Sequence, residues 1–244
     1  MSKSIISKKI LFWYDNNKRI LPWRKNNSKE QKLYFTLVSE FMLQQTQVST
    51  VTPYFKRFVQ KIPNFKKLSK VNDQILMKLW EGLGYYSRAR NLKKSAIMIN
   101  GKFGGTLPSN IEDLKSLPGV GDYTSTAIMA IAFNQKFIPL DGNVERILKR
   151  VLYLRNEKDI SKENMQISKN FFGLSERASD YAQAIMELGA LVCRPTSPLC
   201  EMCPINRNCI AYKRKDFTLI KKMKKNKIKY FEANICMNEN EMLL

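Results

Sequence analysis

Four cysteines near the C-terminal end limit what this chain can fold into more than any other feature of the sequence. Cys193, Cys200, Cys203 and Cys209 form a C-x6-C-x2-C-x5-C run, which lets four thiolates of one short loop surround a single inorganic core. Structural zinc usually takes two C-x2-C pairs separated by a longer insert, whereas this run contains one such pair. The spacing therefore favours a [4Fe–4S] cluster over zinc as the cofactor. Cys236 lies outside the run and is expected to be a small buried or free thiol.

The charge of the chain points to a polyanionic partner. The 42 Lys and Arg residues outnumber the 21 Asp and Glu residues, and the net charge of +21 repels itself unless an anionic surface is bound. Nucleic acid is the leading candidate. The alternative is that a chain rich in Lys, Ile and Asn reflects an A·T-rich coding sequence, so charge alone does not define the function.

Other features of the composition exclude several classes of protein. With 244 residues, 44% of them apolar, the chain can bury a sizeable core. No segment approaches the roughly 18 consecutive apolar residues of a membrane span, and the N-terminal apolar run is too short for a signal peptide. We therefore expect a soluble, cytoplasmic protein without a membrane partner. The absence of histidine excludes every mechanism that uses imidazole as a base or ligand.

The pattern of apolar residues predicts a mainly α fold. Apolar residues recur at helical spacing, as at Leu33, Leu37 and Phe41, while alternating patterns typical of strands are scarce before residue 228. Pro and Gly residues fall between the periodic runs and mark helix boundaries. From residue 213 onward a basic stretch leads into a weakly alternating end, which is expected to be a linker followed by a first strand or hairpin, or else a frayed tail.

The segment from Ile111 to Phe133 predicts a helix-hairpin-helix. A helix ends near Leu117, the turn Pro118-Gly119-Val120-Gly121 follows, and a second helix begins near Asp122. Such a turn directs backbone N–H groups and a helix N-terminus toward one point, which suits a DNA phosphate without reading base sequence. An ordinary helical corner is the alternative for this segment taken alone.

Two carboxylates have the character needed to cleave a glycosidic bond. Glu40 lies among apolar residues of one helix, which should raise its pKa and make it a general acid, although a structural ion pair would also explain it. Asp141, in the segment Leu140 to Val144, can cap the following helix. Glycosidic cleavage requires an acid for the leaving group and a fixed carboxylate beneath the cationic sugar. Together the two residues match that requirement.

These motifs, in this order, resemble the MutY family of adenine DNA glycosylases, which belongs to the helix-hairpin-helix, iron–sulfur type. The resemblance covers about residues 10 to 212 and implies a fold of two α-helical modules with a cleft between them. It rests on Leu21-Pro22-Trp23-Arg24, Ser39 to Val48, Trp80 to Arg90, the Pro118 hairpin, Leu140 to Val144 and the four-cysteine loop.

The resemblance assigns a role to each candidate residue. It implies that Glu40 protonates a flipped adenine at N7, that Asp141 stabilises the oxocarbenium ion or a covalent sugar intermediate, and that Tyr123 and Asn143 form hydrogen bonds around this centre. Gln45 and Tyr85 are expected to probe or wedge the base stack, although core packing is an alternative role for Tyr85. The residues expected to contact DNA are Gln44, Gln45, Thr46, Tyr85, Arg88, Gly119, Val120 and Gly121.

The resemblance also implies a boundary for each module. We expect an N-terminal helix, residues 1–28, that packs with the cluster module; a six-helix module at 29–139, with the hairpin near 111–133; the cluster module at 140–212; and a basic linker with the remnant of a C-terminal domain at 213–244. The implied partner is double-stranded DNA containing adenine opposite guanine or 8-oxoguanine, bound by a monomer.

One contrast with a related group and two departures from the family bear on the alternatives. Tyr123 stands where the related endonuclease III group has the lysine that makes those enzymes lyases, which disfavours a glycosylase/lyase. Glu145 is an acid where some relatives carry Lys or an apolar residue. The chain stops where relatives begin a domain that recognises 8-oxoguanine, so discrimination of the partner base is in doubt. A non-catalytic iron–sulfur DNA-binding protein is the alternative from another class.

Overall fold

The computed structural model confirms the mainly α prediction. It describes residues 3–25, 28–154, 162–218, 236–237 and 242–243. The long helices are α1 Lys3–Asn17, α2 Lys29–Leu43, α3 Val48–Lys61, α6 Ser87–Lys102, α8 Asp122–Ile131, α9 Gly142–Leu152, α10 Lys162–Phe172 and α11 Ala178–Leu191. The short elements are α4 Phe65–Lys70, α5 Asp73–Trp80, α7 Ile111–Ser116, α12 Ile210–Lys213 and the 3₁₀ turns Pro22–Arg24, Cys200–Met202 and Asn206–Asn208.

Side-chain caps explain where many of the helices begin. Ser28 accepts a hydrogen bond from the Gln31 amide at the start of α2, and Asn64, Asn72, Asn110 and Asp141 cap α4, α5, α7 and α9 in the same way. Each cap satisfies a backbone N–H that the helix leaves without a partner. The cap at Asn72 starts a new helix directly after α4. The described residues between 29 and 139 therefore contain seven helices, one more than the six expected.

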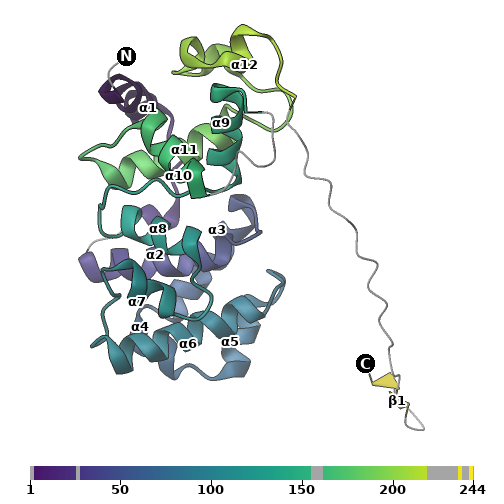
Figure 1. Ribbon diagram of the computed structural model, residues 1–244. Helices are drawn as coiled ribbons and strands as arrows, with labels where there is room; N and C mark the ends of the chain where they lie inside the picture. The colour runs from purple at the N-terminus through teal and green to yellow at the C-terminus, as the bar shows by residue number, and fades with distance from the viewer. Residues whose placement is uncertain (1–2, 26–27, 155–161, 219–235, 238–241, 244) are drawn as a thin grey trace.

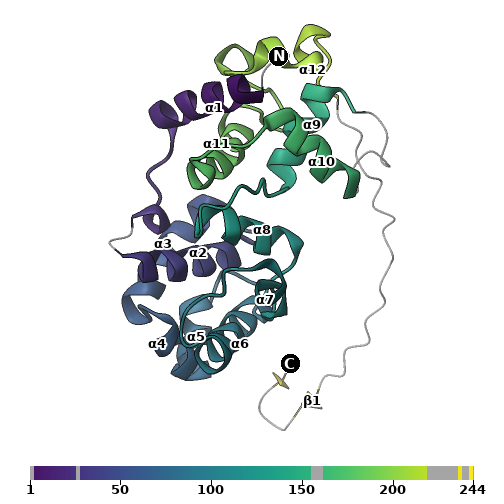
Figure 2. The same ribbon diagram turned by 60° about the vertical axis from the view of Figure 1, so that its left-hand side comes forward.

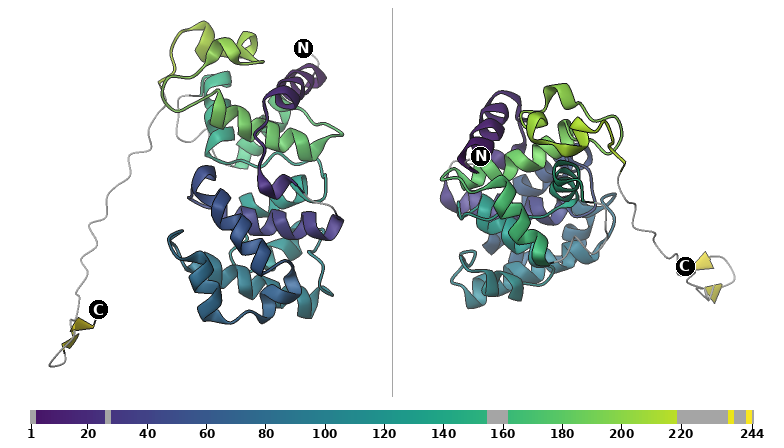
Figure 3. Two further views of the ribbon diagram at one scale, coloured as in Figure 1. Left: turned by 180° about the vertical axis from the view of Figure 1, so that it is seen from behind. Right: turned by 45° about the horizontal axis from the view of Figure 1, so that its top comes forward.

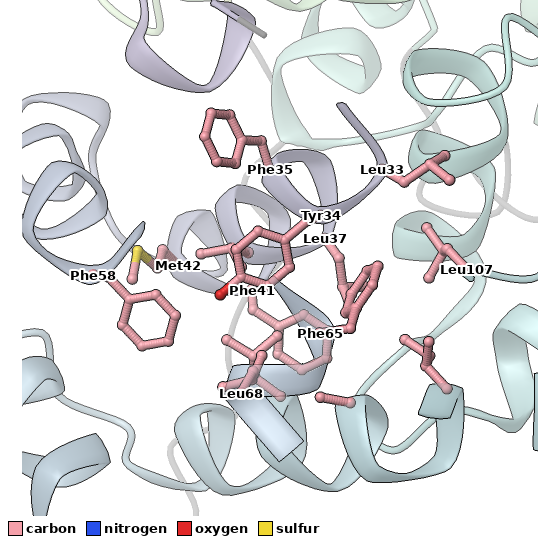
Figure 4. Close-up of a cluster of buried hydrophobic side chains, with 14 of the residues drawn as sticks. Leu33, Tyr34, Phe35, Leu37, Phe41, Met42, Phe58, Phe65, Leu68 and Leu107 are labelled. Atoms are coloured by element: carbon pink, nitrogen blue, oxygen red, sulfur yellow. The ribbon is translucent and has the colours of Figure 1, made fainter. Parts of the chain in front are cut away.

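Two hydrophobic clusters divide the described part of the chain. The first lies within the range 33–132 and includes Tyr34, Phe41, Phe58 and Trp80. Figure 4 shows side chains of α2 converging with Phe58, Phe65 and Leu68 in this cluster. The second cluster joins α1 to α9, α10, α11 and the cysteine loop, with Ile10, Tyr14, Phe172 and Leu188 among its buried members. Helix α1 thus packs far from its neighbours in sequence.

The ribbon views show how these two groups of helices are stacked. In Figures 1 and 2, helices α2 to α8 form the lower group, and α1 and α9 to α12 form the upper one. Figure 3 shows the same two groups from behind, with the segment after α1 descending into the lower group. Of the helices that the structure describes, none has the length and apolar character needed to cross a membrane.

The expected hairpin after the basic stretch is present as two short strands. β1 Cys236–Met237 pairs antiparallel with β2 Met242–Leu243, and Cys236 stands opposite Leu243 in the register. Most of the predicted linker lies outside the described residues.

Candidate active site

A cleft of ≈ 1370 Å³ opens where the two groups of helices meet. Its walls come from the segment after α1, from α2 and the turn that follows it, and from the first residues of α8 and α9 and one face of α11. The structure brings the four predicted catalytic residues to this cleft, because Glu40, Tyr123, Asp141 and Asn143 all line it.

Glu40 presents a carboxyl group that is largely shielded from water. It lies on α2 beside Leu37 and Phe41, which are fully buried, and is itself only 6% exposed. Burial raises its pKa from 4.5 to about 7; the hydrogen bond from Tyr123 lowers the pKa, and the charge of Asp141 raises it. A large fraction of Glu40 is therefore protonated at neutral pH, which equips it to donate a proton.

Tyr123 supports Glu40 from helix α8, which belongs to the same group of helices as α2. It is the second residue of α8, directly after the hairpin turn, and its hydroxyl forms a hydrogen bond with the Glu40 carboxyl group. Burial, together with the charges of Glu40 and Asp141, raises the pKa of Tyr123 well above its usual value. The phenol therefore stays neutral and acts as a fixed hydrogen-bond donor.

Asp141 is both the cap of α9 and a fixed acid of the cleft. Its Oδ1 accepts a hydrogen bond from the Val144 amide at 2.7 Å, and its Oδ2 accepts one from the Asn143 side-chain amide at 2.8 Å. The N-terminus of α9 also favours a negative charge at this point. The structural role and the predicted electrostatic role are compatible, because capping orients the carboxylate rather than removing it from the cleft.

A chain of hydrogen bonds joins Asp141 and Asn143 to the cysteine loop. The Asn143 side-chain oxygen accepts from Arg146 Nη2 at 2.7 Å, and Arg146 also donates to the carbonyls of Gly189 and Cys193, both at 2.7 Å. Gly189 permits this approach, because a Cβ atom at that position would lie 2.6 Å from the Cβ of Asn143. The contact between α9 and α11 at this point therefore has no room for a side chain at position 189.

A second polar cluster of the cleft was missed by the sequence analysis. Glu187 on α11 is 1% exposed and binds Arg19 Nε at 2.8 Å and Arg24 Nη2 at 2.9 Å. Arg24 Nε also donates to the Gln183 side-chain oxygen at 2.6 Å. The available signal was a lone acid in the apolar run of residues 181–192, because a buried charge in such a helix requires a partner.

Gln45 and Tyr85 also line the cleft, and they lie in two turns, one after α2 and the other before α6. Both are exposed, Tyr85 to 64%, and both have positive φ angles, 57° for Gln45 and 48° for Tyr85. The exposure of Tyr85 is inconsistent with the alternative role in core packing. Gln44 and Thr46 flank Gln45, and the Gln44 amide donates to the Gly119 carbonyl at 3.3 Å.

Arg88 lines the cleft, but its side chain is buried, whereas the predicted contact with DNA calls for an exposed one. It is 6% exposed, and its guanidinium donates hydrogen bonds to backbone carbonyls at the end of α2 and in the loop before α6. A side chain held in this way has little freedom to reach a phosphate.

The hairpin between α7 and α8 has the predicted geometry. Gly119 has a φ of 82°, and a Cβ there would lie 2.9 Å from Phe41. The Val120 side chain is buried and its N–H donates to the Leu117 carbonyl at 3.1 Å, so the N–H groups of Gly119 and Gly121 are the candidates for binding a ligand. Ser95 Oγ donates to the Pro118 carbonyl at 2.9 Å and so attaches the turn to α6.

The four predicted cysteine ligands surround one small cavity at the end of α11. Cys193, Cys200, Cys203 and Cys209 all line it and are free of disulfide bonds. Within the described ranges, no group of three or more Cys, Asp or Glu side chains is arranged for a single metal ion. A four-iron cluster differs in this respect, since its cysteines bind separate iron atoms around a larger core. The four cysteines therefore fit a four-iron cluster.

Comparison with known proteins identifies the family. Residues 38–171 match the model of the HhH-GPD superfamily of base excision DNA repair proteins. The chain is 43% identical over 216 residues to the adenine DNA glycosylase of Rattus norvegicus, covering 84% of this chain and 41% of the relative. It is 38% identical to those of two Buchnera aphidicola strains, from Schizaphis graminum and Acyrthosiphon pisum, covering 65% and 71% of their lengths. The chain thus spans about two fifths to seven tenths of the length of these relatives.

Solved structures share the fold. A thermostable thymine-DNA glycosylase superposes with a TM-score of 0.75 at 25% identity, covering 87% of this chain and 97% of the other. An endonuclease III–DNA complex superposes with a TM-score of 0.70 at 22% identity, covering 88% and 98%. With the matched sequence motifs and the shared fold, this chain belongs to the HhH-GPD superfamily of base excision DNA repair proteins and, within it, to the MutY family of adenine DNA glycosylases.

Proposed function

We propose that this chain hydrolyses the N-glycosidic bond of adenine in double-stranded DNA, opposite guanine or 8-oxoguanine. The observation that carries the proposal is the pairing of a buried Glu40, with a pKa of about 7, and a fixed Asp141 in one cleft. The adenine DNA glycosylases that the chain matches at 38–43% identity support adenine as the base. The polyanionic partner indicated by the net charge of +21 is then DNA.

The geometry supports a two-step hydrolysis. Glu40 donates its proton to N7 of the extruded adenine, and the bond between N9 and C1′ breaks with its electron pair going to the base. The resulting sugar cation lies against the Asp141 carboxylate, which stabilises it by its charge or by a transient bond. Water then adds to C1′, and its proton passes to the Glu40 carboxylate, which restores the acid.

The test is single-turnover adenine release from a duplex containing adenine opposite 8-oxoguanine. Glu40→Gln and Asp141→Asn should each slow release by roughly 10²- to 10⁴-fold, the usual contribution of a general acid or a comparable charge. Glu112→Gln, an exposed acid on α7, is the matched control and should retain the wild-type rate. Unchanged release in either active-site variant would contradict the assignment of that residue.

The same assay separates the alternatives. An endonuclease III-like lyase would nick the strand without added base, and Tyr123 offers no amine for that reaction. A binding-only protein would retain the duplex but release no adenine. Comparison of duplexes with guanine, 8-oxoguanine and thymine opposite adenine measures the specificity for the mispair.

We further propose that Cys193, Cys200, Cys203 and Cys209 hold a [4Fe–4S] cluster. Such a cluster, when bound, joins the end of α11 to the loop through four thiolate bonds. A Cys203→Ser variant should lose the visible absorbance and iron content of the protein and lower its melting temperature. Cys236→Ser, outside the run, is the matched control. Iron retained in Cys203→Ser, or zinc found in the wild type, would contradict the cluster assignment.

A further inference from the structure

Arg88 occupies an unusual position for a charged side chain. It is the second residue of α6 and is 6% exposed. Its Nη1 donates to the carbonyls of Met42 at 2.9 Å and Phe41 at 3.2 Å, and also to that of Gln44. Its Nη2 donates to the carbonyls of Leu83 at 3.0 Å and Gly84 at 3.1 Å. One guanidinium thus holds two separate segments of backbone.

The two segments are those that present Gln45 and Tyr85. The Gln44 carbonyl immediately precedes Gln45, and the Gly84 carbonyl immediately precedes Tyr85. Gln45 and Tyr85 both have positive φ angles, which cost free energy for residues other than glycine and persist where surrounding contacts impose them. Arg88 supplies such contacts on the N-terminal side of both residues.

The surroundings of Arg88 suit a guanidinium better than a lysine ammonium. The last carbonyls of α2 carry the negative end of the helix dipole, which favours a positive charge. The planar guanidinium places its two Nη groups against two segments at once, whereas a lysine ammonium is a point charge with three donors. The Arg88 guanidinium also lies 5.6 Å from the ring centroids of Trp80 and Tyr85.

We propose that Arg88 is a positioning residue that sets the relative placement of Gln45 and Tyr85, and that extrusion of the target base from the duplex depends on its guanidinium. The inference rests on the proposed function and on the role expected for Gln45 and Tyr85, which is to probe or wedge the base stack. Holding both turns before DNA arrives avoids the cost of ordering them during binding.

The experiment compares Arg88→Lys and Arg88→Met with Arg90→Lys, an exposed arginine two residues along the same helix. Each protein is assayed for melting temperature, for duplex affinity between 50 and 200 mM salt, and for fluorescence of a 2-aminopurine that replaces the target adenine. Single-turnover adenine release is measured beside them. The 2-aminopurine signal reports base extrusion without requiring bond cleavage.

The positioning role predicts a specific pattern. Arg88→Lys should fold and bind duplex with the wild-type salt dependence, yet lose most of the 2-aminopurine signal and slow adenine release by about 10- to 100-fold, as small misplacements near a reaction centre do. Arg88→Met should show the same loss of extrusion, and Arg90→Lys should resemble the wild type.

Three results would overturn the proposal. Wild-type extrusion by Arg88→Lys would show that the guanidinium is dispensable. A salt slope reduced by about 0.9 in Arg88→Met and restored in Arg88→Lys would identify a direct phosphate contact. Loss of the folded state in both variants would mean that Arg88 supports the whole fold. A wild type that extrudes 2-aminopurine but releases no adenine would instead contradict only the proposed function.

Discussion

At the scale of single residues, the proposed role of Glu40 as a proton donor depends on how its carboxyl group is desolvated. The sequence places it in an apolar helix, but the pKa of about 7 also depends on Tyr123 and Asp141, which come from other elements. A carboxyl group with this pKa changes its protonation state near neutral pH.

The first prediction at this scale concerns the pH dependence of the reaction. If protonated Glu40 is the proton donor, as proposed, single-turnover release should be nearly constant well below pH 7 and fall by about tenfold per pH unit above it. The measurement is a rate profile from pH 5.5 to 9 under enzyme excess. A rate that rises steadily through pH 7 would mean that Glu40 acts as a base.

The raised pKa of Glu40 also predicts that the stability of the folded state depends on pH. Glu40 has a higher pKa folded, about 7, than its ordinary 4.5, so the folded state binds more protons and loses stability as pH rises from 4.5 through 7. The loss is on the order of 3 kcal/mol. Glu40→Gln removes it and should therefore melt at a higher temperature than the wild type at pH 8, and at a similar one at pH 4.5. Equal melting temperatures at pH 8 would contradict this.

A third prediction concerns Gly189, which lies against Asn143. A Cβ at this position would meet the Asn143 side chain at 2.6 Å and its backbone at 3.1 Å. We expect Gly189→Ala to destabilise the protein by roughly 1–3 kcal/mol and to slow adenine release, because Asn143 holds Asp141. Gly101→Ala on α6, where a Cβ meets no atom within 4 Å, is the control for both melting and rate. Similar behaviour of the two variants would contradict the prediction.

At the scale of elements, the hairpin is where the prediction from the sequence agrees best with the structure. The predicted helix end near Leu117 and start near Asp122 agree with α7 and α8. Pro, Gly and capping residues act on their own backbone, so boundaries of this kind can be predicted locally. The division between α4 and α5 depends on the Asn72 cap, which the sequence analysis did not use.

The hairpin yields a prediction with a control inside the same turn. Gly119 has a φ of 82°, and a Cβ added there would lie 2.9 Å from Phe41, whereas Gly121 has a negative φ and no neighbour within 4 Å of an added Cβ. Gly119→Ala should therefore lower the free energy of unfolding by roughly 1–3 kcal/mol, and Gly121→Ala should leave it nearly unchanged. Denaturant unfolding measures both, and equal losses would show that the turn is not strained at Gly119.

At the scale of the whole molecule, a buried ion pair joins the N-terminal segment to α11. Glu187 binds Arg19 and Arg24, which are partly exposed at 34% and 19% of their side chains. Removing the negative charge leaves two arginines beside a neutral group, although water screens them in part.

Glu187→Gln should therefore destabilise the protein by about 1–3 kcal/mol, which is less than the loss expected when one partner of a fully buried ion pair is removed. The control is Glu176→Gln, which removes an exposed pair with Lys136 and should have no measurable effect. Thermal unfolding and limited proteolysis near residue 20 would measure the loss. Resistance of Glu187→Gln to both would indicate that hydrophobic contacts alone hold α1.

The sequence by itself determined the features that act over a few residues: the helices with their caps, the hairpin turn, the four-cysteine run and the candidate acids Glu40 and Asp141. The tertiary structure decided which of these meet. It placed Tyr123 on Glu40, turned Arg88 inward toward backbone carbonyls, and brought Glu187 to two arginines from the other end of the chain. The physical reason is that burial and long-range charge pairing depend on packing between distant segments, whereas caps, turns and ligand spacing depend on neighbouring backbone.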